Sequence, residues 1–563
     1  MINSLSLFEQ TQLAEAAYAS FKGKIGNNMA DVGVALQDKD GGSEFSQTQA
    51  EEFLKHWRVA DQYATGGTGE DPFWTNKKGS GFSATLFESL DRPGEYTFAI
   101  RGSIGANDFK ADLDLIDNSG IAAVQIVDMY NYWQSLITPQ GQTYRAAKLT
   151  VSAAETAARK ALALNPAAQK VYELTLFFKG AIIVEGMVCY LEFCDSGALP
   201  EESKELRFGR GLIKETPAHL NVAGHSLGGH LAMAFNRLFP QMNVDTLAVN
   251  GLGFKFNHGS VNNLFSQLNG AWQFNADRIE NVYGQAGPKL AAMNNGTLQQ
   301  PGGWDGLFIE DGLGHVGGHS AIQMTDSAAV YDLFVRLDAG LAAQSLAEAL
   351  KSLLPLFEAG SGDDSQTLET LVKNLYKIVL GIEPQITKNN RESLYAHLFA
   401  LQNSGDFKAL CGKVTVALLT AGEIETLSAR KDDVGLAYRY ALRELNPFAL
   451  IGADYSAHNA DGSLNLYDEA TGKGTMSEAW INDRVQMLRV MIQGNLEDTV
   501  VDAYGVMNVR THALDTNEQI CFSDVTRNRK ILFSPAETET TRYISFGGAD
   551  AEKITGGTES DRL

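Results

Sequence analysis

The sequence predicts an α/β protein built on a mostly parallel sheet. Three short β-type runs follow one another between helical stretches, at residues 244–250, 278–284 and 306–309. A fourth apolar run, residues 220–223, passes through a glycine-rich turn into an alanine-rich helical stretch. Strands that alternate with helices imply βα units, which form parallel sheets. We therefore predict one α/β domain over residues 62–338.

Length and composition restrict the classes of protein to consider. A chain of 563 residues is long enough for several domains and at least one large core. Its 44% hydrophobic and 20% charged content is ordinary for a globular protein. The formal net charge of −22 disfavours nucleic acid as a partner, because phosphate recognition needs a basic face. The same charge disfavours purely electrostatic docking on anionic lipid.

Cysteine usage and the N-terminus add two expectations. The four cysteines (Cys189, Cys194, Cys411 and Cys521) have no zinc-ligand spacing, and we expect thiols with a single bridge as the alternative. Residues 1–6 lack a basic stretch followed by an apolar core, so no Sec signal peptide is expected.

The chain begins with helical periodicity over residues 1–61, which we expect to pack on the α/β domain as helices, the second over residues 50–59. Two β-type runs follow, at residues 81–87 and 95–100. The turn-forming residues Asp91-Arg92-Pro93-Gly94 separate them, so the two runs are predicted to pair as a hairpin.

A helical insertion is predicted inside the α/β domain, over residues 139–215. Residues 121–136, just before it, and 146–164, within it, carry the clearest helical periodicity. The apolar segment 171–193 follows and is interrupted by four charged residues. We predict a buried or amphipathic helix there and no transmembrane segment.

The most informative stretch is Gly224-His225-Ser226-Leu227-Gly228, which joins the apolar run 220–223 to the alanine-rich helix. Gly-x-Ser-x-Gly between a strand and a helix is the sequence form of a nucleophile elbow. Small residues let the chain turn sharply and place the Ser226 hydroxyl where a helix N-terminus stabilises developing negative charge. The alternative is a structural glycine turn. We predict Ser226 to be a catalytic nucleophile.

A second motif lies upstream, where the run 95–100 ends in Arg101-Gly102-Ser103 and an Asp-rich segment follows. Phe-Ala-x-Arg-Gly-Ser together with a later Gly-His-Ser-Leu-Gly-Gly resembles the class 3 lipase family of the α/β-hydrolase superfamily. The resemblance implies an α/β-hydrolase-type fold with helical insertions. It also implies an oxyanion hole formed by Ser103 and the backbone N–H of Leu227. The alternative for Arg101-Gly102-Ser103 is a plain strand-end turn. The family places lids near the insertion, so segment 171–193 is expected to be a lid or a core helix.

The serine needs a base to take its proton, and in this fold the chain order is serine, acid, histidine. Four histidines follow Ser226 within the α/β domain. His230 lies one turn into the next helix, and His258 comes too early. His315 and His319 share a glycine-rich loop before the last helical stretch. The family's His-Ser pair at the start of the final helix matches His319, with His315 as the alternative.

The acid is where the sequence departs from the family. Class 3 lipases carry an aspartate shortly after the penultimate strand, but here that step is Gln285-Ala286-Gly287-Pro288. Asp305, Glu310 and Asp311 precede the histidine loop in chain order. We predict Asp311, which follows the run 306–309, and keep the other two as alternatives. Each can also be an ordinary solvated carboxylate.

The C-terminal part is predicted to contain a helical accessory region over residues 339–448 and a mixed α/β region over residues 449–546. In residues 547–563 a Gly-Gly pair recurs after nine positions, together with an acidic and an apolar position. This resembles the start of an RTX nonapeptide array, whose carboxylates bind Ca²⁺. The resemblance implies Ca²⁺ ligands at Asp550, Glu552 and Asp561, and a secreted, longer parent chain. The alternative is a disordered Gly/Asp-rich tail.

These motifs favour a serine carboxylic-ester hydrolase that acts on lipid esters, a lipase, and needs no cofactor for its chemistry. Its partner would be a lipid or phospholipid interface. Phospholipase A1 is the runner-up. An RTX-type structural or adhesion protein with a non-catalytic hydrolase domain is the alternative from another class.

Overall fold

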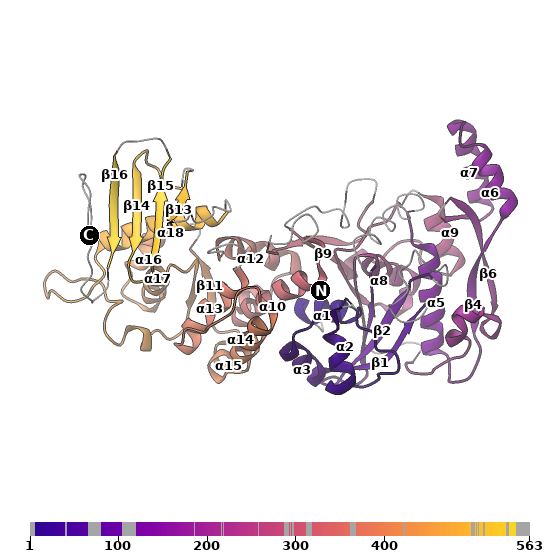
Figure 1. The fold of residues 1–563 in the computed structure, drawn as a ribbon, viewed down its shortest axis with the longest axis horizontal. Coiled ribbons are helices and arrows are strands. Elements are labelled where there is room, and N and C mark those ends of the chain that lie inside the picture. The colour runs from indigo at the N-terminus through magenta and orange to yellow at the C-terminus, as the bar shows by residue number, and fades with distance from the viewer. Residues whose placement is uncertain are drawn as a thin grey trace. The chain divides into compact units, whose positions relative to one another are not determined.

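A seven-stranded sheet forms the centre of the first of two units into which the chain divides, Met1–Ala329 and Val330–Leu563 (Figure 1). The computed structural model describes residues 6–39, 42–65, 80–103, 120–184, 186–214, 217, 219–256, 258–285, 292, 294, 298–310, 318–360, 367–419, 423–496, 502, 504, 506–510, 513–535 and 540–547.

The central sheet is mixed but largely parallel. Its strands in spatial order are β1 (Trp57–Ala64), β2 (Ser83–Ser89), β3 (Glu95–Ile100), β7 (His219–His225), β8 (Asp245–Val249), β9 (Ile279–Gly284) and β10 (Gly303–Leu307). β1, β2 and β3 are antiparallel, which confirms the predicted hairpin, and β3 to β10 are parallel. The carboxyl ends of five strands therefore meet at one edge of the sheet.

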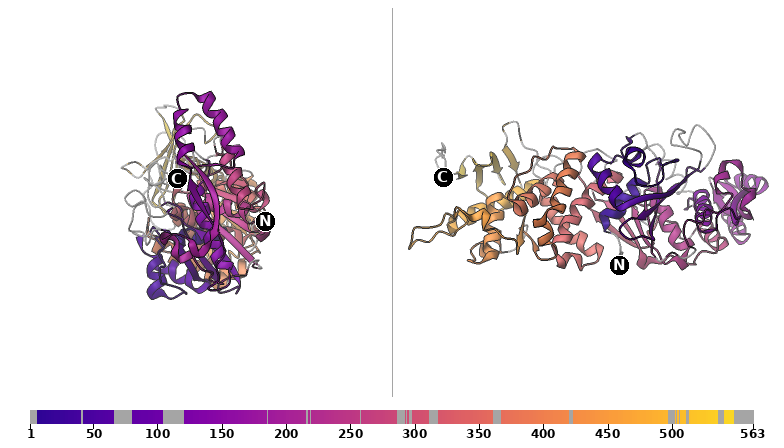
Figure 2. Two further views of the ribbon diagram at one scale, coloured as in Figure 1. Left: turned by 90° about the vertical axis from the view of Figure 1, so that its right-hand side faces the viewer. Right: turned by 90° about the horizontal axis from the view of Figure 1, so that it is seen from below.

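Helices cover both faces of this sheet (Figures 1 and 2). Successive residues of a strand point to opposite faces, so Phe98 and Ala99 belong to different cores. The Ala99 core is closed by α1 (Leu7–Ala16), the π-helical turn Met29–Gly33, α2 (Val34–Leu36) and α3 (Gln47–His56). The Phe98 core is closed by α5 (Ala123–Ile137), α8 (Leu227–Leu238) and α9 (Gly259–Gln267), while α10 (Ala321–Leu337) follows β10 in the chain.

The predicted insertion contains strands as well as helices, so the expected helix over residues 146–164 is wrong in its first half. Residues Arg145–Val151 form β4, and α6 covers only Ala153–Ala161. Ala146 and Ala147 are buried, and the whole of β4 pairs antiparallel with β6 (Met187–Asp195). Cross-strand pairing thus outweighs the helical preference of the alanines.

The single helix expected within residues 171–193 is also wrong. Helix α7 covers Pro166–Phe178 and stops before Gly180, which has a left-handed φ of +80°. A hairpin of β5 (Ile182–Val184) and β6 follows, and Gly186 at its turn also has a positive φ. Glycine at such positions ends a helix, and a β-branched run favours a strand. The expected helix over residues 50–59 likewise ends at His56, because Trp57 begins β1.

The second unit is mostly helical in its first part and mixed in its second. Its helices are α11 (Ala339–Ala342), α12 (Leu346–Gly360), α13 (Thr367–Leu380), α14 (Arg391–Asn403), α15 (Gly405–Leu410), α16 (Ile424–Ser428), α17 (Asp433–Glu444) and α18 (Glu478–Leu496). Its strands are β11 (Thr415–Leu418), β12 (Phe448–Ile451), β13 (Val506–Val509), β14 (Gln519–Asp524), β15 (Arg529–Phe533) and β16 (Thr541–Phe546). β13, β15, β14 and β16 form a four-stranded sheet, and β11 pairs with β12. The buried ion pair of Arg484 on α18 with Asp524 on β14 joins the helix to this sheet.

Several further expectations concern ligands and membranes. Within the described residues, no helix has the length and apolarity to cross a membrane, and no cluster of His, Cys, Asp and Glu is suited to hold a metal ion. The expected Ca²⁺ ligands Asp550, Glu552 and Asp561 lie outside the described residues. All four cysteines are free thiols.

Candidate active site

The nucleophile elbow lies between β7 and α8, at the carboxyl edge of the sheet. Ser226 has φ +58° and ψ −123°, a strained conformation for a residue with a side chain. The chain can pass through this corner because Gly224 and Gly228 have no side chain. A Cβ on Gly224 would lie 2.2 Å from the carbonyl oxygen of Gly228, and one on Gly228 would lie 2.1 Å from that of Ile100. These two glycines of the motif are therefore steric requirements.

His319 is brought to this serine from 93 residues further along the chain. Its Nε2 lies 2.8 Å from Ser226 Oγ, so the hydroxyl donates a hydrogen bond to the imidazole. Ser226 is buried and His319 is partly buried, in the segment just before α10. This is the spacing that a nucleophile and its general base require.

Burial sets the protonation state of the imidazole. It lowers the pKa of His319 well below the ordinary value, and the neighbouring His225 lowers this pKa further. A neutral imidazole at Nε2 accepts the serine proton, whereas a protonated one does not. The site therefore holds His319 in the form that a base needs near neutral pH.

His225, the residue before the serine, holds the backbone of His319. Its Nε2 lies 2.6 Å from the carbonyl oxygen of His319, and its Nδ1 lies 2.7 Å from the hydroxyl of Tyr18. A carbonyl oxygen only accepts, so Nε2 carries the proton and Nδ1 accepts a hydrogen bond from Tyr18. Burial lowers the pKa of His225 to about 4, which keeps this tautomer neutral.

Asn250 holds the same segment one residue earlier. Its Nδ2 donates to the carbonyl oxygen of Gly318 at 3.1 Å, and its Oδ1 accepts from the N–H of Gly284 at 3.1 Å. Asn250 follows β8 and has a φ of +49°, which aims its amide across the strand ends. The carbonyl groups of Gly318 and His319 are therefore both held by buried side chains of the sheet's carboxyl edge.

The predicted oxyanion donors lie on two elements that meet at Ser226. Leu227 is the first residue of α8, so its N–H has no acceptor within the helix. The loop after β3 approaches the serine through Gly102, whose Cβ would lie 3.0 Å from Ser226 Cβ and 2.5 Å from the Tyr18 hydroxyl. Ser103 follows Gly102 directly. The structure thus brings both predicted segments to the nucleophile.

The predicted acid Asp311 and the alternative base His315 lie outside the described residues. Of the alternative acids, Asp305 is on β10, and its charge acts on Glu280 of β9. Burial raises the pKa of Glu280 to about 6, and Asp305 adds to that shift. Glu310 is described and lies beyond β10. Asp311 remains the predicted acid.

The other two histidines that follow Ser226 in the domain have structural roles. His230 is buried on α8, where its Nε2 accepts a hydrogen bond from the N–H of Ala122 and its ring stacks on Phe254. His258 caps α9 by accepting from the N–H of Ser260. Packing was the role expected of His230.

Three residues of the site have no clear signal in the sequence. His225 is adjacent to the nucleophile and Asn250 follows a predicted strand. These positions place both residues near the site, but they do not show which groups the side chains contact. Tyr18 lies 207 residues before His225, directly after α1, in a region expected only to cover the sheet. Only the packing of α1 on β3, β7 and β8 brings it here.

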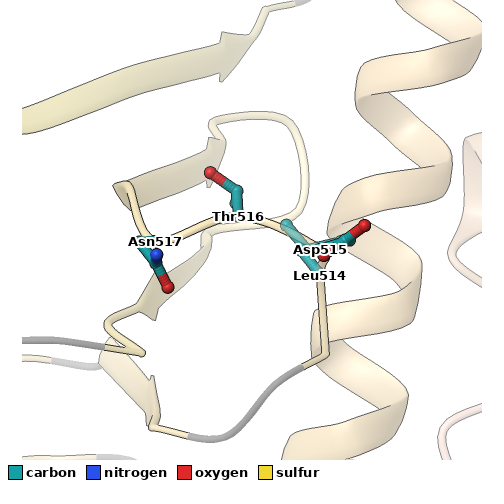
Figure 3. Close-up of a pocket in the computed structure, with 4 residues that line it drawn as sticks. All are labelled: Leu514, Asp515, Thr516 and Asn517. Atoms are coloured by element: carbon teal, nitrogen blue, oxygen red, sulfur yellow. The ribbon is translucent and has the colours of Figure 1, made fainter.

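A separate pocket in the second unit does not provide competing chemistry (Figure 3). It lies on the loop before β14 and is lined by Leu514, Asp515, Thr516 and Asn517. None of these four side chains is a histidine, lysine or cysteine, so the Thr516 hydroxyl has no basic neighbour among them that would activate it.

Comparisons with known proteins identify no family. No family model matches the sequence, and no curated protein matches it. A solved structure described as the M37 lipase aligns with 57% of this chain and 91% of its own, at 14% identity and a TM-score of 0.24. Such a low TM-score carries no weight for fold or chemistry, and the function proposed below rests on the site.

The lowered pKa of His319 predicts a particular pH dependence. A base whose pKa is lowered stays neutral as the pH falls, so the acid limb of kcat/KM for ester hydrolysis is expected below the ordinary histidine value of about 6.5. The stability of the fold also falls as the pH drops from about 6.5 to about 4. Burial lowers the pKa of His225 and His230 to about 4, so over this range the unfolded chain binds more protons than the folded one. Circular dichroism at each pH separates the two effects. A limb at or above 6.5 with the fold intact would contradict this account.

The contacts of His225 predict a positioning effect. His225→Leu removes the donor to the His319 carbonyl and is expected to lower kcat about 10²-fold, the order of cost of a misplaced catalytic group, with a smaller change in KM. His225→Gln keeps an N–H donor and should recover much of the rate. Steady-state kinetics on a soluble ester make the comparison. Equal losses in the two variants would show that only the shape of the buried side chain matters.

Proposed function

We propose that this chain is a serine carboxylic-ester hydrolase whose first unit has an α/β-hydrolase-type fold. The observation that carries the proposal is the hydrogen bond of 2.8 Å between Ser226 Oγ, at a strained strand-to-helix corner, and His319 Nε2. A buried serine in this strained conformation costs stability, and such strain is found mainly at sites with a chemical task.

Each residue has a defined part in the proposed reaction. Ser226 Oγ attacks the ester carbonyl carbon while its proton passes to His319 Nε2. The N–H groups at Leu227 and the Ser103 loop stabilise the oxyanion. The C–O bond then breaks, and the alcohol leaves with the proton from His319. Water attacks the acyl-serine with His319 as its base, the acid is released, and the proton returns to Ser226.

Lipid esters are the proposed substrate class. Support comes from the two motifs that resemble class 3 lipases, Phe-Ala-x-Arg-Gly-Ser and Gly-His-Ser-Leu-Gly-Gly, which meet in space at Gly102 and Ser226. The predicted Ca²⁺ at the C-terminal repeats would have no part in the chemistry. Secretion remains part of the same proposal.

A substrate panel tests this function. Initial rates are measured on a soluble p-nitrophenyl ester, a triglyceride emulsion and phosphatidylcholine vesicles, with the Ser226→Ala protein as background. Hydrolysis of the soluble ester and the emulsion supports a lipase. Fatty acid released mainly from the vesicles would favour phospholipase A1. No hydrolysis of any ester by folded wild-type protein would contradict the proposal and favour a non-catalytic hydrolase domain.

A further inference from the structure

Helices α6 and α7 form a hairpin that projects beyond the small sheet of β4, β6 and β5 (Figures 1 and 2). Helix α7 is anchored on one side only. Leu176 is buried, and Tyr172 packs against the small core that Leu176 shares with β5 and β6. Phe177 lies against Gly259 at the start of α9. The opposite side of α7 faces outward.

This outward side is apolar. Val171, Leu174 and Phe178 are 67%, 56% and 78% exposed, and the spacing of three and four residues places them on one stripe of the helix. Leu164, in the turn that begins the helix, is 99% exposed. We call these four residues the α7 stripe. Single exposed aliphatic residues are normal, but an aligned series on a projecting element marks an interaction surface.

The charge of the hairpin differs in sign from that of the chain. The chain carries −22, whereas residues 153–179 contain four basic and two acidic residues. Both acidic residues are neutralised within the hairpin, by the ion pairs Glu155–Lys179 and Glu173–Arg159. The excess charge therefore lies on Lys160 and Lys170, which are exposed and form no ion pair with any described residue. A basic margin beside an apolar stripe complements a surface that is apolar below and anionic above.

We propose that the α7 stripe docks this protein on a lipid surface that carries anionic headgroups. Val171, Leu174 and Phe178 enter the headgroup boundary, while Lys160 and Lys170 meet the anionic groups. The net charge of −22 opposes electrostatic attachment of the whole molecule, so the basic hairpin orients the contact and the apolar side chains hold it. This inference names the surface from which the proposed esterase takes its substrate, and in that sense it rests on the proposed function.

Vesicle sedimentation with the inactive Ser226→Ala protein tests the docking without any dependence on catalysis. Two kinds of vesicle are compared: mixed vesicles of phosphatidylglycerol and phosphatidylcholine, and vesicles of phosphatidylcholine alone. We expect the mixed vesicles to bind at least tenfold more protein. Leu174→Ser/Phe178→Ser should lower that partitioning at least tenfold. Lys160→Glu/Lys170→Glu should lower it on mixed vesicles only.

Matched controls keep the outcomes distinct. Ile382→Ser, at a residue 60% exposed in the second unit, should leave binding unchanged. The stripe variants, made in active protein, should hydrolyse a soluble ester at the wild-type rate. If folded wild-type protein hydrolyses no ester at all, the proposed function is refuted and the docking result still stands. Unchanged vesicle binding in the stripe variant would overturn the docking. So would a wild-type protein that self-associates through the stripe and does not bind vesicles, with the variant remaining monomeric. Loss of soluble-ester hydrolysis in the stripe variant would also overturn it.

Discussion

Replacing Ser226 with alanine is expected to lower kcat on a soluble ester by about 10⁶-fold, the order seen when a triad serine is removed. The reason is that Ser226 Oγ lies at the strained strand-to-helix corner with His319 Nε2 2.8 Å away to take its proton. His319→Ala is expected to cost about as much, and the double variant little more, because the two residues act as one unit. Release of p-nitrophenol, followed by stopped flow for the fast variants and at an endpoint for the slow ones, measures these rates.

The control for this prediction is a serine of equal burial without the imidazole. Ser327 on α10 is buried, and its hydroxyl contacts no hydrogen-bond partner among the described residues, so Ser327→Ala should leave kcat unchanged. Near-ultraviolet circular dichroism checks that each variant is folded. A Ser226→Ala protein that keeps more than about one hundredth of the activity would mean that another group is the nucleophile, since a true triad serine leaves far less.

The second large effect is expected at the acid. Asp311→Asn should lower kcat about 10⁴-fold, because an asparagine cannot hold the base in the correct tautomer. Asp311 is placed by chain order, directly after Glu310 and eight residues before His319. Asp305→Asn and Glu310→Gln are the matched controls and should change kcat much less, since the charge of Asp305 acts on Glu280.

The same kinetic assay decides between the three carboxylates. A loss in Asp305→Asn or Glu310→Gln that exceeds the loss in Asp311→Asn would transfer the role of the acid to that residue. Small losses in all three variants would mean that the base is oriented without a carboxylate, with the hydrogen bond from His225 Nε2 to the His319 carbonyl oxygen holding its backbone.

Much of the central sheet could be predicted from the sequence, and the errors have a common cause. The hairpin of β2 and β3 and the strands β8 and β9 follow from local alternation and turn residues, which are short-range signals. β10 (Gly303–Leu307) begins three residues before the expected run 306–309 and shares only two residues with it. β4 and β6 were missed because alanine and apolar residues fit a helix equally well in isolation. Their pairing from Arg145 to Asp195 decides the outcome, and this pairing is a long-range contact.

The site was predictable to the same extent. Sequence motifs predict Ser226, Leu227 and Ser103. The chain order, with a histidine just before the last helix of the domain, predicts His319. The residues that hold His319, namely Tyr18, His225 and Asn250, act through single hydrogen bonds that the fold alone brings together. No local pattern predicts a contact between residues 18 and 225, because α1 has to pack on the sheet first.

The most direct test of the central claim is covalent labelling of the nucleophile. Folded protein is treated with a p-nitrophenyl phosphonate ester, which phosphonylates an activated serine, and the adduct is located by peptide mass spectrometry. The account predicts one phosphonyl group per chain on Ser226, formed far more slowly in His319→Ala and absent in Ser226→Ala. Labelling of another residue, or no labelling of folded wild-type protein, would contradict it.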